Sequence, residues 1–272
     1  MGNKEFPYYK NRFNPLRAFS NQNHGDQSGK GGILNIAQMI DHSLLKPEVT
    51  EEEIKKLCEE SRKYGFVSVC VNPVWVSLCL DLLKGSSVQG ESLPFRPEPS
   101  GRRQDKSVKI CTVSGFPLGT NKSEIKAKEA EIAIKDGADE IDMVANIGAL
   151  RAGDFKLVEE DIKAVRNAIG NEKILKVIIE TAVLTKQEKV KSTEIIIACG
   201  ADFVKTSTGF GYSGATVEDV KLLKKVVGDK IRIKASGGIR DYNTALELIE
   251  AGASRIGTSS GVKIVEQSRR FA

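Results

Sequence analysis

The chain has 272 residues, of which 40% are hydrophobic and 28% charged, so its composition is globular and excludes the disordered and collagen-like classes. The net charge of +5 is too small to indicate nucleic-acid binding by itself, and no apolar run is long enough to cross a membrane. Five cysteines without a paired or metal-binding spacing predict a reduced, cytoplasmic protein without structural zinc.

The first segment of the chain, 1–32, is rich in Asn, Gln, Gly and basic residues and has no sustained hydrophobic period. We interpret it as a disordered tail that precedes a single domain, 33–272. The segment is also poor in acids, so an organelle transit peptide is the alternative interpretation.

Short apolar runs rich in β-branched residues follow, and helical patterns fill the intervals between them. The predicted strands are 36–40, 66–71, 108–113, 140–144, 174–179, 201–205, 231–234 and 254–257. The predicted helices are 50–64, 73–84, 122–136, 154–169, 185–199, 216–227 and 241–251. Thr50, Asn121 and Thr185 each stand three residues before a glutamate, which predicts a capping box at three of the helix starts. A glycine follows each helical run, as helix ends favour.

The alternation of buried-type strands with helices predicts a parallel sheet covered by helices. Eight strands in about 235 residues predict a (β/α)8 barrel, the TIM-barrel fold. A doubly wound open sheet is the alternative, although no GxGxxG motif follows the first strand. The irregular segment 86–107 lies between a helix and a strand, so in a barrel we expect it to be a surface loop on the face opposite the active site.

Three of the predicted strands carry a lysine, which is rarely buried without a partner: Lys176, Lys205 and Lys234. Asp142 lies in a fourth strand. A neighbouring cation lowers the pKa of an amine, and the neutral amine can attack a carbonyl and form a Schiff base. Two facing lysines with a carboxylate for proton transfer therefore predict an imine-forming enzyme. The alternative is that the lysines only pair with acids for stability.

Turns of small and hydroxyl residues follow the last three strands, at 208–211, 236–240 and 257–260. Backbone N–H groups and hydroxyls in such turns bind phosphate, and Arg240 adds a positive charge. Because TIM barrels often hold a phosphate after strands 7 and 8, these turns predict a phosphate site.

Eight motifs in the chain occur in the order typical of one family. They are DHSLLKP at 41–47, CVNP at 70–73, GFPLG at 115–119, EIDMV at 140–144, KVIIET at 176–181, FVKTSTG at 203–209, KASGGIR at 234–240 and GTSS at 257–260. With them the chain resembles the deoxyribose-phosphate aldolase family over roughly 34–262. The resemblance implies reversible cleavage of 2-deoxy-D-ribose 5-phosphate to acetaldehyde and D-glyceraldehyde 3-phosphate, without a metal or an organic cofactor.

The resemblance also implies roles for individual residues. Lys205 would form the Schiff base, Lys234 would lower its pKa, and Asp142 would relay protons through a water. Asp41 and Cys70 match positions of the substrate pocket. To Lys176 we assign a supporting electrostatic role. The positions that match the phosphate-binding turns are Gly209, Gly237, Gly238, Gly257, Ser259 and Ser260, with Arg240 beside them.

The partner expected from the resemblance is a small sugar phosphate, with no nucleic acid and no membrane, and the chain is expected to form a homodimer or tetramer. Phe210 stands where some members carry a lysine, so we expect phosphate binding to depend more on the backbone and on Arg240. Two alternatives stay open: a Schiff-base aldolase for a longer sugar phosphate, and a non-catalytic barrel that binds a sugar phosphate or a partner through 86–107.

Overall fold

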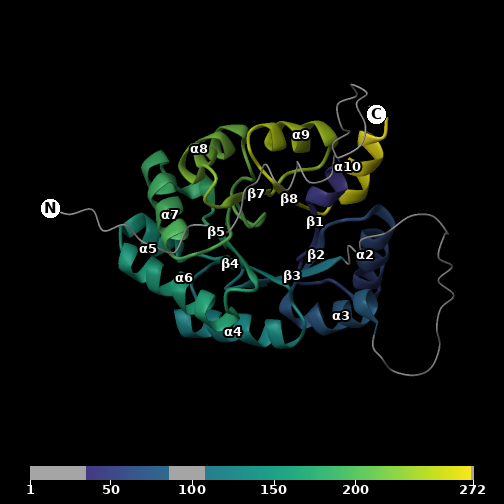
Figure 1. The fold of residues 1–272 in the computed structure, drawn as a ribbon, viewed down its shortest axis with the longest axis horizontal. Helices are drawn as coiled ribbons and strands as arrows, with labels where there is room; N and C mark the ends of the chain where they lie inside the picture. The colour runs from purple at the N-terminus through teal and green to yellow at the C-terminus, as the bar shows by residue number, and fades with distance from the viewer. Residues whose placement is uncertain (1–34, 86–107, 271–272) are drawn as a thin grey trace, which may run out of the picture.

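The computed structural model describes residues 35–85 and 108–270, so the predicted tail, 1–32, and the predicted surface loop, 86–107, lie outside the described residues. Eight parallel strands pair in chain order from β1 to β8, and β8 pairs with β1 to close a barrel. The strands lie at the centre of the molecule with the helices around them (Figure 1). The predicted TIM barrel is therefore confirmed.

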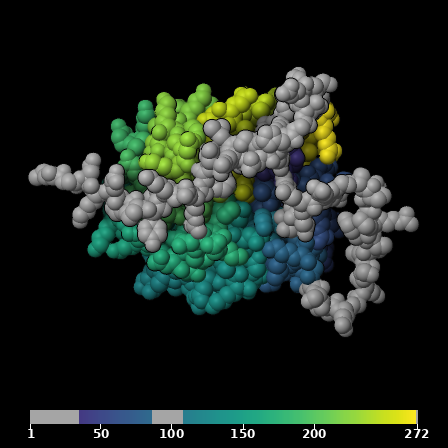
Figure 2. Space-filling view, in the orientation of Figure 1, coloured from purple at the N-terminus to yellow at the C-terminus, as the bar shows by residue number. Residues whose placement is uncertain are grey.

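The strands are β1 (Ile40–Leu44), β2 (Ser68–Val71), β3 (Lys109–Ser114), β4 (Glu140–Val144), β5 (Ile174–Ile178), β6 (Phe203–Lys205), β7 (Arg232–Ser236) and β8 (Arg255–Thr258). The α-helices are α2 (Glu51–Tyr64), α3 (Val76–Lys84), α4 (Ser123–Lys135), α5 (Ile147–Ala152), α6 (Phe155–Ile169), α7 (Lys186–Ala198), α8 (Val217–Val227), α9 (Tyr242–Glu250) and α10 (Gly261–Ser268). Short 3-10 helices are η1 (Ile36–Met39), η2 (Pro73–Trp75) and η3 (Thr181–Val183). The coloured segments follow one another around the molecule, and blue α2 and yellow α10 meet where the barrel closes (Figure 2).

The prediction for the first strand is wrong in position. Residues 36–39 form η1, and β1 begins at Ile40 and includes Asp41 and His42, both of which are buried. We took the charged Asp41 to mark the end of the strand, but the inside of this barrel accepts charged side chains. Ile36 and Ala37 are instead buried in the apolar core.

Two of the three predicted capping boxes are confirmed. The hydroxyls of Thr50 and Thr185 accept from the backbone N–H three residues on, and the glutamates there accept in return. The prediction at Asn121 is wrong, because α4 begins at Ser123 and has Lys122 at its N-cap without a side-chain bond. The short helices α5 and α10 were not predicted.

Alternate strand residues separate two kinds of environment, because successive side chains point to opposite faces of a strand. Ile141, Val177 and Ile233 join the large apolar core between the strands and the helices. Their neighbours Asp142 and Lys176 have side chains inside the barrel, where they pair with each other. Within residues 35–85 and 108–270, no helix has both the length and the apolar composition needed to cross a bilayer.

Candidate active site

Strand register brings the predicted lysines and carboxylate together. Asp142 of β4 is opposite Lys176 of β5, and Lys205 of β6 is opposite Lys234 of β7. All four residues are buried, with at most 2% of their surface exposed. Lys205 is the last residue of β6, and the other three are the middle residues of their strands. TIM-barrel enzymes hold their catalytic groups toward the carboxyl ends of the strands.

Asp142 is the centre of this group. Its Oδ2 accepts from Lys205 Nζ at 2.8 Å and from Lys234 Nζ at 2.7 Å, while its Oδ1 accepts from Lys176 Nζ at 2.7 Å. One carboxylate oxygen therefore holds the two lysine nitrogens of β6 and β7 beside each other. The sequence predicted this pairing only as one of two alternatives for the lysines.

A second layer of charged groups supports Asp142 from the floor of the barrel. Asp41 accepts from Lys234, from Arg255 Nη1 at 2.5 Å and from Ser68 Oγ at 2.7 Å. Glu140 pairs with Lys176 at 2.6 Å and with Arg255 at 3.2 Å. Asp41 is fully buried in this layer. Arg255 and Glu140 were not among the predicted site residues.

The electrostatics of this cluster favour the charged forms of Asp41, Asp142, Lys176 and Lys234. Burial alone would raise the pKa of Asp142, but the surrounding lysines outweigh it and lower the pKa well below its ordinary value. In the same way, Arg255 and Lys234 outweigh burial and lower the pKa of Asp41. Burial alone would lower the pKa of Lys234 and of Lys176, but Asp142 and other carboxylates raise both. Lys234 is thus a fixed cation beside Lys205.

Two cysteines lie opposite each other on β2 and β3 within the barrel. A hydrogen bond with Cys111 lowers the pKa of the Cys70 thiol despite burial, whereas burial raises that of Cys111. Cys111 Sγ also lies 3.2 Å from Asp142 Oδ1 and 3.3 Å from Lys176 Nζ. Cys70 therefore lies one side chain away from the carboxylate, and Cys111, which the sequence analysis did not identify, touches it.

Two sets of donor atoms in this region are close enough together to hold a metal ion. They are those of Cys70, Cys111 and Asp142 and those of Asp41, Cys111 and Glu140, each set within 4.8 Å. Their carboxylates already bond to lysine and arginine side chains, and those cations would repel a metal ion. The donor set therefore fits ammonium and guanidinium groups and does not fit a metal.

The predicted phosphate-binding turns lie beside the lysines. Backbone hydrogen bonds join the β6–α8 and β7–α9 turns: the N–H of Ala215 donates to the carbonyls of Ser236 at 3.0 Å and of Gly237 at 3.2 Å. A Cβ on Gly209 would lie 3.8 Å from Gly237 Cα, so the two turns touch. Gly257 passes close to Lys234, whose Cε would lie 2.9 Å from an added Cβ.

The remaining predicted positions of these turns are more open. Gly238, Arg240 and Ser259 are exposed, and Ser260 is half-buried at the start of α10. Backbone and hydroxyl donors thus stand at the rim, while the lysines stand below them. This places a rim of exposed donors beside a buried group of amines.

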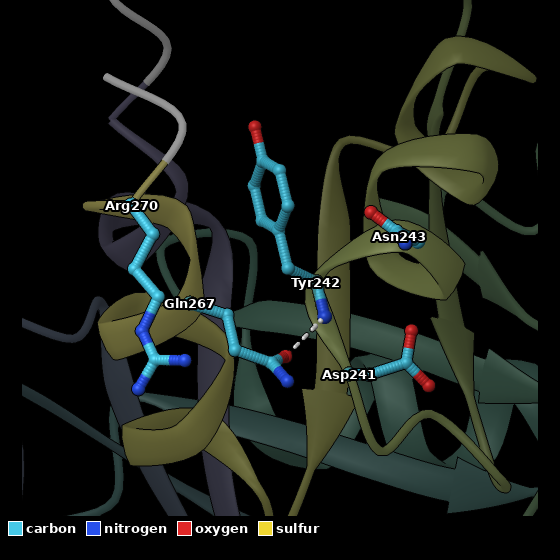
Figure 3. A pocket seen from close by; sticks show the side chains of 5 residues that line it. All are labelled: Asp241, Tyr242, Asn243, Gln267 and Arg270. Atoms are coloured by element: carbon cyan, nitrogen blue, oxygen red, sulfur yellow. Dashed lines mark hydrogen bonds between the residues drawn. The ribbon is translucent and has the colours of Figure 1, made fainter.

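A separate small pocket of about 200 Å³ lies between α9 and α10 (Figure 3). The backbone N–H of Tyr242 donates to Gln267 Oε1 at 2.9 Å across it. Asp241, Asn243 and Arg270 complete its lining, and none of the candidate catalytic side chains is among them. We therefore place the candidate active site at the buried lysines and not in this pocket.

A closed (β/α)8 barrel with paired lysines and a carboxylate inside it defines an enzyme of the aldolase class, a carbon–carbon lyase. The profile of the DeoC/LacD family aldolases matches residues 35–267, and the chain belongs to this family. The resemblance that the sequence motifs indicated is therefore confirmed.

The relatives of the chain carry consistent names. A deoxyribose-phosphate aldolase of Caldanaerobacter subterraneus subsp. tengcongensis is 52% identical over 240 residues, which are 88% of this chain and 95% of that protein. A solved structure described as a putative deoxyribose-phosphate aldolase from Coccidioides immitis is 38% identical, with a TM-score of 0.78, covering 89% of this chain and 88% of that one. A deoxyribose phosphate aldolase from Aeropyrum pernix, described as tetrameric, is 30% identical, with a TM-score of 0.72, covering 87% and 92%.

Proposed function

We propose that the protein reversibly cleaves 2-deoxy-D-ribose 5-phosphate to acetaldehyde and D-glyceraldehyde 3-phosphate through a Schiff base on Lys205. The observation that carries the proposal is the sharing of one oxygen, Asp142 Oδ2, by the nitrogens of Lys205 and Lys234. The names of the relatives support the substrate, and a fixed ammonium beside an amine is the arrangement that favours a neutral nucleophile.

The reaction follows from these groups. The Nζ of Lys205 attacks C1 of the open-chain sugar, and loss of water gives a protonated imine. Removal of the proton from the C3 hydroxyl breaks the C2–C3 bond, releases D-glyceraldehyde 3-phosphate and moves the electron pair into an enamine. Protonation of C2 and addition of water then release acetaldehyde and the free amine. Asp142 relays these protons through a water.

The other predicted residues have supporting parts in this proposal. Lys176 and Asp41 hold Asp142 and Lys234 in place through ion pairs, and Cys70 lines the pocket next to them. The sugar phosphate binds at the rim. Its donors are the turn residues Gly209, Gly237, Gly238, Gly257, Ser259 and Ser260, with Arg240 as the nearby cation.

Trapping with borohydride tests the proposal. We expect the wild-type protein, incubated with deoxyribose 5-phosphate and reduced, to carry an adduct that mass spectrometry of a digest locates on Lys205. K205L should give neither an adduct nor turnover while keeping its fold. An adduct on another lysine, or turnover by K205L, would contradict the assignment. Trapping only with longer sugar phosphates would favour a different Schiff-base aldolase.

The proposal extends to assembly and location. We expect a homodimer or tetramer in the cytoplasm. Large apolar side chains exposed on neighbouring elements, among them Val74, Leu118 and Ile125, support an interface between copies, and five free cysteines suit a reducing compartment. Light scattering across a range of concentrations tests the assembly, and a monomer throughout would refute it. Fractionation of cells that express the chain tests the location.

A further inference from the structure

Glu180 has an unusual backbone conformation directly after β5. Its φ of 51° and ψ of 68° lie in the left-handed region, and it is the only non-glycine residue with positive φ in the part of the chain that the structure describes. This conformation is unfavourable for a residue with a Cβ, and it persists where surrounding contacts compensate for it. The side chain is 92% buried, so the compensation lies in what the carboxylate touches.

The carboxylate of Glu180 is bonded to the turn that follows β6. Its Oε2 accepts from Thr208 N at 3.2 Å and from Thr208 Oγ1 at 2.5 Å. The same hydroxyl accepts from Phe210 N at 3.1 Å. Glu180 therefore fixes the direction of the Thr208 hydroxyl, and the hydroxyl fixes the next residues of the turn. The other oxygen, Oε1, is buried and has no hydrogen-bond partner.

The turn 208–211 is fitted closely around this carboxylate. A Cβ on Gly211 would lie 2.9 Å from the carboxyl carbon of Glu180, a distance that real Cβ atoms do not adopt. Gly209 lies against Gly237 of the next turn. The ring of Phe210 meets that of Phe116 edge-on, with the centroids 5.3 Å apart. One carboxylate thus holds a turn that contacts both the phosphate rim and the β3–α4 loop.

We propose that Glu180 is a positioning residue that holds the turn 208–211 in the shape needed to bind the phosphate of the substrate. The inference rests on the proposed function and deepens it, since it assigns the phosphate preference to a side chain that does not touch the phosphate. Only Oε2 takes part in the bonds to Thr208. A glutamine can supply the same acceptor with its amide oxygen and place its NH2 at the Oε1 position.

Kinetics with and without the phosphate group test this role. Loss of the two acceptor contacts in E180A should raise KM for deoxyribose 5-phosphate about tenfold, with kcat little changed. Cleavage of unphosphorylated 2-deoxyribose by the same variant should stay close to wild type. E180Q should behave like wild type. E180G removes the cost of the left-handed backbone, so it keeps the fold measurable while showing the KM defect of E180A.

Two further variants locate the path of the effect. T208V removes the hydroxyl that Glu180 orients. The rise in KM in E180A/T208V should therefore be close to that of the larger single variant, and smaller than the product of the two single fold-changes. G211A pushes on the carboxylate from the other side and should also raise KM. An E180A variant with unchanged KM, an equal rise for both sugars, or a defect in E180Q as large as in E180A would overturn the proposal.

Binding of inorganic phosphate, measured by calorimetry, gives a readout that does not depend on turnover. E180A should bind phosphate more weakly than E180Q and wild type. If the wild-type protein neither cleaves nor is trapped by deoxyribose 5-phosphate, the proposed function fails, whereas the phosphate measurement still decides the role of Glu180. Equal phosphate affinity in E180A and wild type would refute that role.

Discussion

Asp142 pairs with three buried lysines and, in the proposed function, relays protons, so D142N should lower stability and turnover together. The carboxylate accepts from Lys176 through Oδ1 and from Lys205 and Lys234 through Oδ2. An asparagine has one acceptor oxygen and one NH2 donor. Whichever way its amide is turned, the NH2 group faces at least one ammonium that has lost one of its acceptors.

The size of the effect follows from the burial of the partners. Removal of one member of a buried ion pair costs about 3–5 kcal/mol, because an uncompensated charge is left in the interior. For a domain of this size, each kcal/mol shifts Tm by about 2–4 °C, so we expect D142N to melt about 6–20 °C below wild type. Loss of a general acid–base group should also lower kcat by about 10²–10⁴-fold.

A second substitution tells the two effects apart. In D142N/K176M the amide can turn its oxygen to Lys205 and Lys234, and its NH2 then no longer faces a third ammonium. Glu140 keeps its pairing with Arg255. We expect the double variant to recover about 1–3 kcal/mol relative to D142N, the coupling typical of contacting residues. Turnover should not recover, because no carboxylate has been restored.

Urea denaturation of wild type, both single variants and the double variant gives the coupling energy, and aldol cleavage assayed on the same samples gives the chemistry. Stability of D142N within about 1 kcal/mol of wild type would refute the reasoning about buried charge. Additive losses in the double variant would refute the orientation argument. Turnover by D142N near that of wild type would exclude Asp142 from proton transfer.

Three further outcomes are expected. Burial lowers the pKa of His42, so the unfolded state binds a proton near pH 6.5 more readily than the folded state does. The free energy of unfolding, measured by urea denaturation at several pH values, should therefore fall as pH drops below 6.5. H42Q should not show this fall. G214A would place a Cβ against the carbonyl of Gly237, so KM for the sugar phosphate should rise. Burial lowers the pKa of Lys126 and raises that of Asp161, so for both groups burial counts for more than their ion pair. Urea denaturation should therefore show K126M/D161L to be as stable as wild type or more stable. D161L alone should be less stable, because it leaves the Lys126 charge buried without its partner.

The fold could be predicted because its signals are local. Apolar runs, capping residues and terminal glycines each depend on a few neighbouring residues, and all eight strands overlap the predicted ranges, β1 only at Ile40. The first strand was misplaced because its interior residue Asp41 is charged, and short-range hydropathy assigns such a residue to a loop. Hydropathy misplaces any strand whose inward-facing residues are polar because they form the site.

The site could be predicted only in part, because its second layer depends on contacts between distant residues. Arg255 pairs with Asp41 across 214 positions and with Glu140 across 115. Glu140 lies two residues before Asp142 on one strand, so the period of two could have placed it inside the barrel. The left-handed conformation of Glu180 has no comparable signal, since a glutamate gives no local indication of positive φ.

The charge count of the interior supports Lys205 as the proposed nucleophile. Among the described residues, the ion pairs join three carboxylates, Asp41, Glu140 and Asp142, to three lysines and Arg255, so one positive charge is unbalanced. Arginine does not lose its proton, Lys176 pairs with three carboxylates and Lys234 with two. Lys205 pairs with Asp142 alone, so a Schiff base on Lys205 would disturb the fewest ion pairs. In the proposed function, the lysine with the least ion pairing is thus the one that attacks the sugar.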